Sequence, residues 1–152
     1  MLIQKQAAQG EQHISVSKEE YKMQYHVRTR ILIIDDEPDI TFGFKKALRH
    51  KGFEQVETVN DPLLALKNFK AGSYDLLIID IVMPEMDGFG LYEEIRKIDN
   101  KVKVCFITAF EVNYQALRAV FPSATTADDI GCFIRKPVDI DDLVKRINAE
   151  VQ

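Results

Sequence analysis

The amino-acid sequence predicts a doubly wound α/β fold, in which helices cover both faces of a five-stranded parallel sheet. Short, unbroken apolar runs, clearest at 31–34 and 76–79, are typical of strands buried on both faces. Segments with an apolar stripe at helical spacing separate these runs, so strands and helices alternate five times. Polar residues end the strands, and right-handed crossovers bring all such ends to one edge of the sheet.

Composition and charge argue against several classes of function. The chain has 152 residues, enough for one domain, and a net charge of −4, unlike the basic surface of a nucleic-acid-binding protein. It contains no apolar run of about 20 residues and no signal peptide, so we expect a cytoplasmic protein with neither membrane nor direct nucleic-acid partners. Cys105 and Cys132 both lie in apolar runs, which favours buried, reduced thiols over a disulfide.

The first 28 residues are predicted to form a polar extension in front of a domain that spans 29–152. Ser17 and Glu20 have the spacing of a capping box, which predicts a short helix over about 18–27. A frayed, disordered extension is an equal alternative, because the segment is polar and weakly patterned.

The capping residues support the alternation of elements along the domain. Pro38 suits the first turn of a helix that Gly52 ends, and Asp61 and Pro62 provide the cap and first residue of the next, which Gly72 ends. The predicted strands are 31–34, 55–59, 76–79, 102–107 and 131–134. The predicted helices begin near 38, 62, 89, 112 and 140, and 123–129 is predicted to be a loop or short turn.

Four strands end in residues that could form one site. Asp35 and Asp36 follow the first strand, Asp80 the third, Thr108 the fourth and Lys136 the fifth. Three carboxylates at one edge repel one another unless a cation intervenes, and the available cations are the lysine ammonium and Mg²⁺, which prefers oxygen ligands. A carboxylate left to react could accept a phosphoryl group, whose charge the cations and the threonine hydroxyl would stabilise. Each residue alone could be an ordinary surface or strand-end residue, but their joint placement favours a site.

Five features occur in a fixed order. They are Ile-Leu-Ile-Ile-Asp-Asp-Glu-Pro at 31–38, Leu-Ile-Ile-Asp-Ile-Val-Met-Pro-Glu-Met-Asp-Gly at 77–88, Ile-Thr-Ala at 107–109, Phe133, and Lys136-Pro137. Over about residues 30–151 the chain therefore resembles the receiver domain of two-component response regulators. The resemblance implies a flavodoxin-like fold with strand order 2-1-3-4-5.

The resemblance also implies residue roles. Asp80 matches the phosphoacceptor, and Asp35 and Asp36 match the acidic pair that holds Mg²⁺ together with Asp80 and the backbone carbonyl of Val82. Lys136 matches the lysine that pairs with the phosphoryl group, and the family has a cis peptide before the following proline.

Two further residues match the switch of receivers. In the family, the hydroxyl at the position of Thr108 moves toward the phosphoryl group, and the ring at the position of Phe133 turns inward. The chain departs from the family in the long segment between these residues, where the extra positions lie near 121–129. Apolar Val82 and Phe110 occupy the two positions beside the path of the hydrolytic water, which predicts slow self-dephosphorylation.

These features predict a stand-alone receiver that acts by protein contact. Its expected partners are a histidine kinase or histidine phosphotransfer protein and an unknown downstream protein, and the only reactions it would catalyse are its own phosphorylation and dephosphorylation. A fragment of a longer regulator would have the same sequence.

Three alternatives remain open. A receiver-like interaction module would work without phosphorylation. A Mg²⁺-dependent phosphohydrolase would need an acid at Val82, and a flavin-binding domain would need a loop rich in Ser, Thr and Gly where 35–39 is acidic.

Overall fold

The computed structural model describes residues 2–6, 13–109 and 132–151. Its central element is a parallel sheet with the order β4-β3-β5-β6-β7. The strands are β3 Arg30–Ile34, β4 Gln55–Val59, β5 Leu76–Asp80, β6 Lys103–Thr108 and β7 Phe133–Arg135. Numbered within this sheet alone, the order is 2-1-3-4-5, so the predicted fold class and strand order are confirmed.

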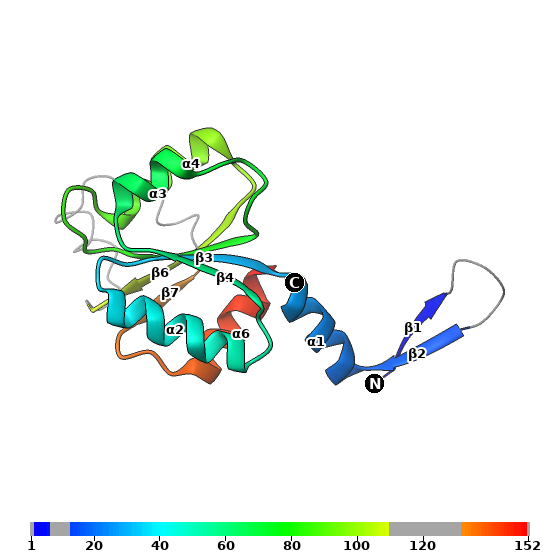
Figure 1. Cartoon of the computed structure of the whole chain (residues 1–152). Helices are drawn as coiled ribbons and strands as arrows, with labels where there is room; N and C mark the ends of the chain where they lie inside the picture. Colours follow the sequence, from blue (N-terminus) through cyan, green and yellow to red (C-terminus); the bar gives the residue numbers. More distant parts are fainter. Residues whose placement is uncertain (1, 7–12, 110–131, 152) are drawn as a thin grey trace.

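Helices cover both faces of the sheet, as Figure 1 shows. On one face lie α3 Pro62–Asn68 and α4 Gly88–Ile98, and on the other lie α2 Pro38–His50 and α6 Ile140–Val151. The core is accordingly divided into two apolar clusters, one on each side of the sheet. All five residues of β5 are buried, which explains why its apolar run does not alternate with polar residues.

Local chemistry sets the helix ends much as the sequence predicted. Pro38 is the first residue of α2, and Gly52 follows that helix with a φ of +97°, a conformation that glycine adopts at little cost. The Asp61 side chain caps α3 by accepting hydrogen bonds from two backbone N–H groups. This helix ends at Asn68, earlier than the predicted stop at Gly72.

The N-terminal extension contains a hairpin that the sequence did not predict. Strands β1 Leu2–Gln6 and β2 His13–Ser17 pair antiparallel, and Figure 1 shows them projecting away from the main sheet. Helix α1 Lys18–Arg28 follows, and its capping box between Ser17 and Glu20 is present. This helix spans the range that the capping-box spacing predicted.

Helix α1 is held against the domain by His26. This side chain is buried, and its ring stacks on Phe53 with 4.0 Å between centroids. One ring nitrogen lies 3.0 Å from the Lys51 carbonyl oxygen and the other 3.0 Å from the side-chain oxygen of Asn148. The extension thus contacts the chain just beyond α2 and the C-terminal half of α6.

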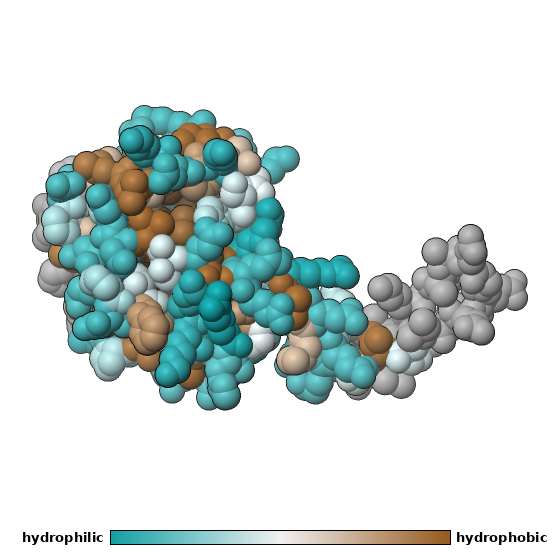
Figure 2. Space-filling view, viewed as in Figure 1, coloured by the Kyte–Doolittle hydropathy of each residue, from teal (hydrophilic) through white to brown (hydrophobic). Residues whose placement is uncertain are grey.

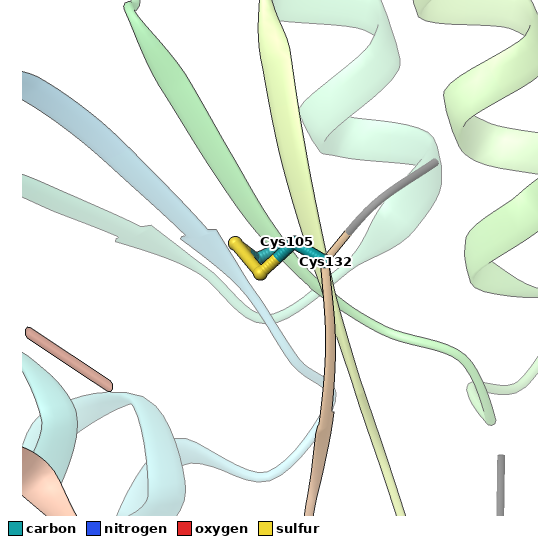
Figure 3. The surroundings of a disulfide bond; sticks show 2 residues. All are labelled: Cys105 and Cys132. Carbon is teal, nitrogen blue, oxygen red and sulfur yellow. A yellow bond between two sulfur atoms is a disulfide. The ribbon is translucent and has the colours of Figure 1, made fainter. Parts of the chain in front are cut away.

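The prediction of two reduced thiols is wrong, because Cys105 and Cys132 form a disulfide (Figure 3). The two residues are 27 positions apart, but β6 and β7 are neighbouring strands and place the two Cα atoms 4.6 Å apart. The strand order implied by the resemblance already made these strands neighbours, but it does not give the register that places Cys105 beside Cys132.

Three sequence predictions lie outside the described residues: the helix at 112–120, the loop at 123–129 and the position of Phe110. Among the described residues, no helix has the length and apolar character needed to cross a membrane. In the view of Figure 2 hydrophilic side chains cover most of the surface, and apolar ones gather around α3, whose Leu63 and Leu64 are 45% and 47% exposed.

Candidate functional site

The predicted polar cluster lies at the carboxyl edge of the sheet. Asp35 and Asp36 directly follow β3, and Asp80 is the last residue of β5. One carboxylate oxygen from each of these three residues lies within 4.8 Å of the others. Lys136, just beyond β7, places its Nζ atom 3.1 Å from Oδ2 of Asp35 and 3.3 Å from Oδ2 of Asp80. Residues that are far apart in the sequence are therefore in direct contact.

Asp35 is held in place through its backbone and its side chain. Its N–H donates to the Val59 carbonyl of the neighbouring strand, at 3.3 Å. Its Oδ1 accepts from the N–H of Glu37 at 3.0 Å, and its carbonyl accepts from the side-chain amide of Asn60 at 2.8 Å. Oδ2 therefore points to the lysine while Oδ1 stabilises the start of α2. Asp36 is partly exposed, so it faces the solvent side of the cluster.

Asp80 is also buried, with 5% of its surface exposed. Its Oδ1 accepts a long hydrogen bond from the N–H of Val82, at 3.4 Å. The backbone at this point has no room for a side chain from α4, because a Cβ atom on Gly88 would lie 2.4 Å from the Asp80 carbonyl oxygen. The Gly88 N–H also donates to the Ile81 carbonyl at 2.8 Å. Glycine at this position therefore lets α4 begin directly against the strand that carries Asp80.

Burial and like charge shift the acidity of the cluster. Burial raises the pKa of Asp80, the neighbouring carboxylate of Asp35 also raises it, and Lys136 partly opposes both, so that the net pKa is about 6. Burial lowers the pKa of Lys136, but the two carboxylates outweigh burial and the net pKa is raised. Three ionised carboxylates and one ammonium have a formal charge of −2, so the cluster favours binding of a further cation.

The two residues predicted to form a switch lie on adjacent strands. Thr108 ends β6 with no exposed surface, and its carbonyl accepts from the N–H of Lys136 at 2.8 Å. Phe133 begins β7, and its ring is buried, 5.6 Å from that of Phe106 and 6.2 Å from that of Phe89 between centroids. The peptide bond between Lys136 and Pro137 is cis, as the resemblance implied.

Comparison with known families shows to which protein family this fold and its polar site belong. The model of the response regulator receiver domain matches residues 31–148 of the chain. The chain belongs to the response regulator receiver family. Receivers are signalling modules of two-component systems, in which they interact with histidine kinases and downstream effectors.

Relatives of this receiver include both short and long proteins. It is 33% identical over 119 residues to the chemotaxis protein CheY of Bacillus subtilis, which covers 78% of this chain and 94% of that protein. It is 31% identical over 120 residues to the transcriptional regulatory protein TrcR of Mycobacterium tuberculosis, covering 79% of this chain and 44% of that protein. The chain thus spans about half the length of the transcriptional regulators that it matches.

Two of the solved structures that are similar to this chain match it over nearly their whole length. The response regulator TrrA of Thermotoga maritima, in complex with Mg²⁺ and BeF, is 30% identical with a TM-score of 0.66, covering 80% of this chain and 97% of that one. A receiver domain protein of Clostridium thermocellum is 28% identical with a TM-score of 0.65, covering 81% and 94%.

The acidic residues of this receiver fit a magnesium ion. The three clustered carboxylates offer oxygen ligands only, and Asp36 is exposed enough for bound water to complete a coordination shell. Asp35, Asp36 and Asp80 are the side chains that would hold the ion. The carbonyl of Val82 stays a predicted ligand.

Sequence reasoning missed two features of the site. The first is that the rings of Phe89 and Phe106, whose centroids are 4.7 Å apart, both pack against the ring of Phe133 on one face of the sheet. Alternation along β6 could have placed Phe106 and Thr108 on the same face, two residues apart. The close contact of Gly88 with the Asp80 backbone gave no signal in the sequence, because it depends on how α4 packs.

Proposed function

We propose that Asp80 of this receiver accepts a phosphoryl group, with Mg²⁺, from a histidine kinase or histidine phosphotransfer protein. The observation that carries the proposal is the contact of Lys136 with Asp35 and Asp80 beside the cluster of three carboxylates. This arrangement places a nucleophile next to fixed positive charge and to ligands for a metal. The only reactions that the protein would catalyse are its own phosphorylation and dephosphorylation.

The protonation state and the position of Asp80 suit it to accept the phosphoryl group. With a pKa of about 6, its carboxylate is mostly ionised at neutral pH and can attack the phosphorus of a phosphohistidine. A P–O bond to Asp80 forms as the P–N bond breaks, and the departing imidazole keeps the electron pair. Bound Mg²⁺ would supply positive charge to the phosphoryl oxygens. Lys136 would then exchange its contact with the carboxylate for one with the phosphoryl group.

Readout of the phosphoryl group is assigned to Thr108 and Phe133. The Thr108 hydroxyl would donate a hydrogen bond to a phosphoryl oxygen, and the Phe133 ring would be held inward against Phe89 and Phe106. This change would alter a protein-interaction face. The altered face would bind a downstream protein.

Slow loss of the phosphoryl group is part of the proposal. Val82 follows Asp80 by two residues and its side chain is 45% exposed, so it borders the open side of the site. A valine has no polar atom with which to orient an attacking water. A Val82→Asn variant should therefore lose its phosphoryl group faster than the wild type, and equal decay rates would contradict this part.

The test uses a small-molecule phosphodonor, acetyl phosphate, with intact-mass detection. We expect wild-type protein to gain one phosphoryl group with Mg²⁺ and none without it, and Asp80→Asn to gain none. Asp61→Asn is a matched control, because it makes the same substitution away from the site at a helix cap where asparagine serves equally well. If folded wild type gains no phosphoryl group, the proposal fails in favour of an interaction module that works without phosphorylation.

A further inference from the structure

The disulfide links the two strands that carry the switch residues. Cys105 lies on β6, three residues before Thr108, and Cys132 directly precedes Phe133 on β7. Figure 3 shows the bond joining these neighbouring strands. At the same point the N–H of Phe106 donates to the Cys132 carbonyl at 2.9 Å. The position of Phe133 relative to β6 is therefore set one residue away by a covalent bond.

The disulfide and the aromatic cluster lie on opposite faces of the sheet. Cys105 and Cys132 are 0% and 1% exposed and belong to the core cluster that α6 covers with Leu143 and Ile147. Phe106 and Phe133, the residues that follow the two cysteines, belong to the cluster on the other face. The backbone that joins Cys132 to Phe133 is therefore a direct path by which a change at the sulfur atoms can reach the Phe133 ring.

Reduction of the disulfide requires the two sulfur atoms to move apart. Two thiol sulfurs in van der Waals contact lie further apart than two bonded sulfurs, and a close-packed interior has little room for the difference. In the part of the chain that the structure describes, both sulfurs are enclosed by buried side chains. The direct way to make room is to move the start of β7 away from β6, which displaces Phe133 from its place against Phe106.

We propose that reversible oxidation of Cys105 and Cys132 regulates the phosphoryl-dependent switch, and that the oxidised form favours the inward position of Phe133. The inference rests on the proposed function of Asp80. In oxidation the two thiols lose two protons and two electrons to a small-molecule disulfide, which becomes two thiols, and a dithiol reverses the reaction. Because the disulfide coexists with an inward ring in this structure, a ligand that favours the inward ring should bind the oxidised form more tightly.

The experiment measures the affinity of the protein for beryllofluoride, a phosphoryl mimic, by titration calorimetry with Mg²⁺. The full chain is used in the oxidised form and after reduction with dithiothreitol, and intact mass verifies the state of the cysteines. Since both sulfurs are buried, exchange is slow and the two forms can be compared separately. We expect the oxidised form to bind at least about fivefold more tightly, the lower end of ordinary coupling between sites.

A Cys105→Ala, Cys132→Ala double variant provides the matched control. It has no cross-link, so its affinity should be weaker than that of oxidised wild type and should not respond to dithiothreitol. Coupling is reciprocal, so saturating beryllofluoride should lower the reduction potential of the pair, by about 30 mV for a tenfold difference in affinity.

Three results would overturn the inference. Equal affinities of the oxidised and reduced forms would leave the disulfide as a structural cross-link alone. An equal effect of dithiothreitol on the double variant would assign the change to another part of the protein. Failure of both forms to bind beryllofluoride would instead reject the proposed function of Asp80, and this inference with it.

Discussion

Lys136 and Asp80, 56 residues apart in the chain, form an ion pair at the carboxyl edge of the sheet, with 3.3 Å between Nζ and Oδ2. The same ammonium lies 3.1 Å from Asp35, so a single cation serves two buried carboxylates. This geometry makes Lys136 important for stability as well as for the proposed transfer, because each carboxylate would otherwise keep its charge in a site with little water.

Replacing Lys136 with methionine should destabilise the protein at neutral pH. The variant leaves two buried carboxylates without their cation, and we expect a loss of about 2 kcal/mol at pH 7.5, less than for a fully buried pair because the lysine is partly exposed. The loss should shrink at pH 5, where Asp80 takes up a proton. Urea denaturation at the two pH values measures it. Lys97→Met, which breaks a solvent-exposed pair with Glu94, should cost much less, and equal costs of the two variants would contradict the prediction.

The raised pKa of Asp80 predicts a pH dependence of stability without Mg²⁺. Because the folded pKa of about 6 lies above the unfolded value, the folded state binds more protons, and stability falls as pH rises from about 4 to about 6. Asp80→Asn cannot ionise, so its advantage over wild type should grow across this window to about 2–3 kcal/mol at pH 7. Denaturation of both proteins in chelator-treated buffers gives the difference. A difference that stays constant from pH 4 to pH 7 would show that burial of this charge costs nothing.

Gly88→Ala should disturb the site through the backbone. The new Cβ would lie 2.4 Å from the Asp80 carbonyl oxygen, so strand or helix must shift, at a cost of about 1–3 kcal/mol. The shift also moves Asp80 relative to Asp35, so Mg²⁺ affinity should fall by calorimetry. Gly43→Ala, on α2 with no atom within 4 Å of the new Cβ, should instead stabilise by about 0.5–1 kcal/mol. The prediction fails if both variants behave alike.

Reduction of the disulfide should lower the free energy of unfolding. The bond links residues 27 positions apart, and the loop-closure model gives a stabilisation of about 3.5 kcal/mol for a loop of this length. Denaturation of the wild type with and without dithiothreitol measures the loss. The Cys105→Ala, Cys132→Ala variant should show no response to the reductant, and an unchanged wild type would mean that the unfolded chain gains little freedom from reduction.

The sequence by itself determined the order of the strands of the main sheet and the residues of the candidate site. Fully buried parallel strands require continuous apolar runs such as the one ending at Asp80, and the helices between them require an apolar stripe and capping residues such as Pro38 and Asp61. These are local requirements, so they are visible in consecutive residues. The strand ends then meet at one edge for any right-handed parallel sheet, which brought Asp35, Asp80 and Lys136 together in the prediction.

Only the tertiary structure decided which distant side chains touch. The disulfide between Cys105 and Cys132 depends on the register in which β6 and β7 pair, and the contact of Gly88 with the Asp80 backbone depends on how α4 packs on the sheet. The docking of His26 on Phe53 likewise depends on where α1 folds back. Such contacts join residues with no common period or motif. They follow from the packing of whole elements, which minimises exposed apolar surface over the entire domain.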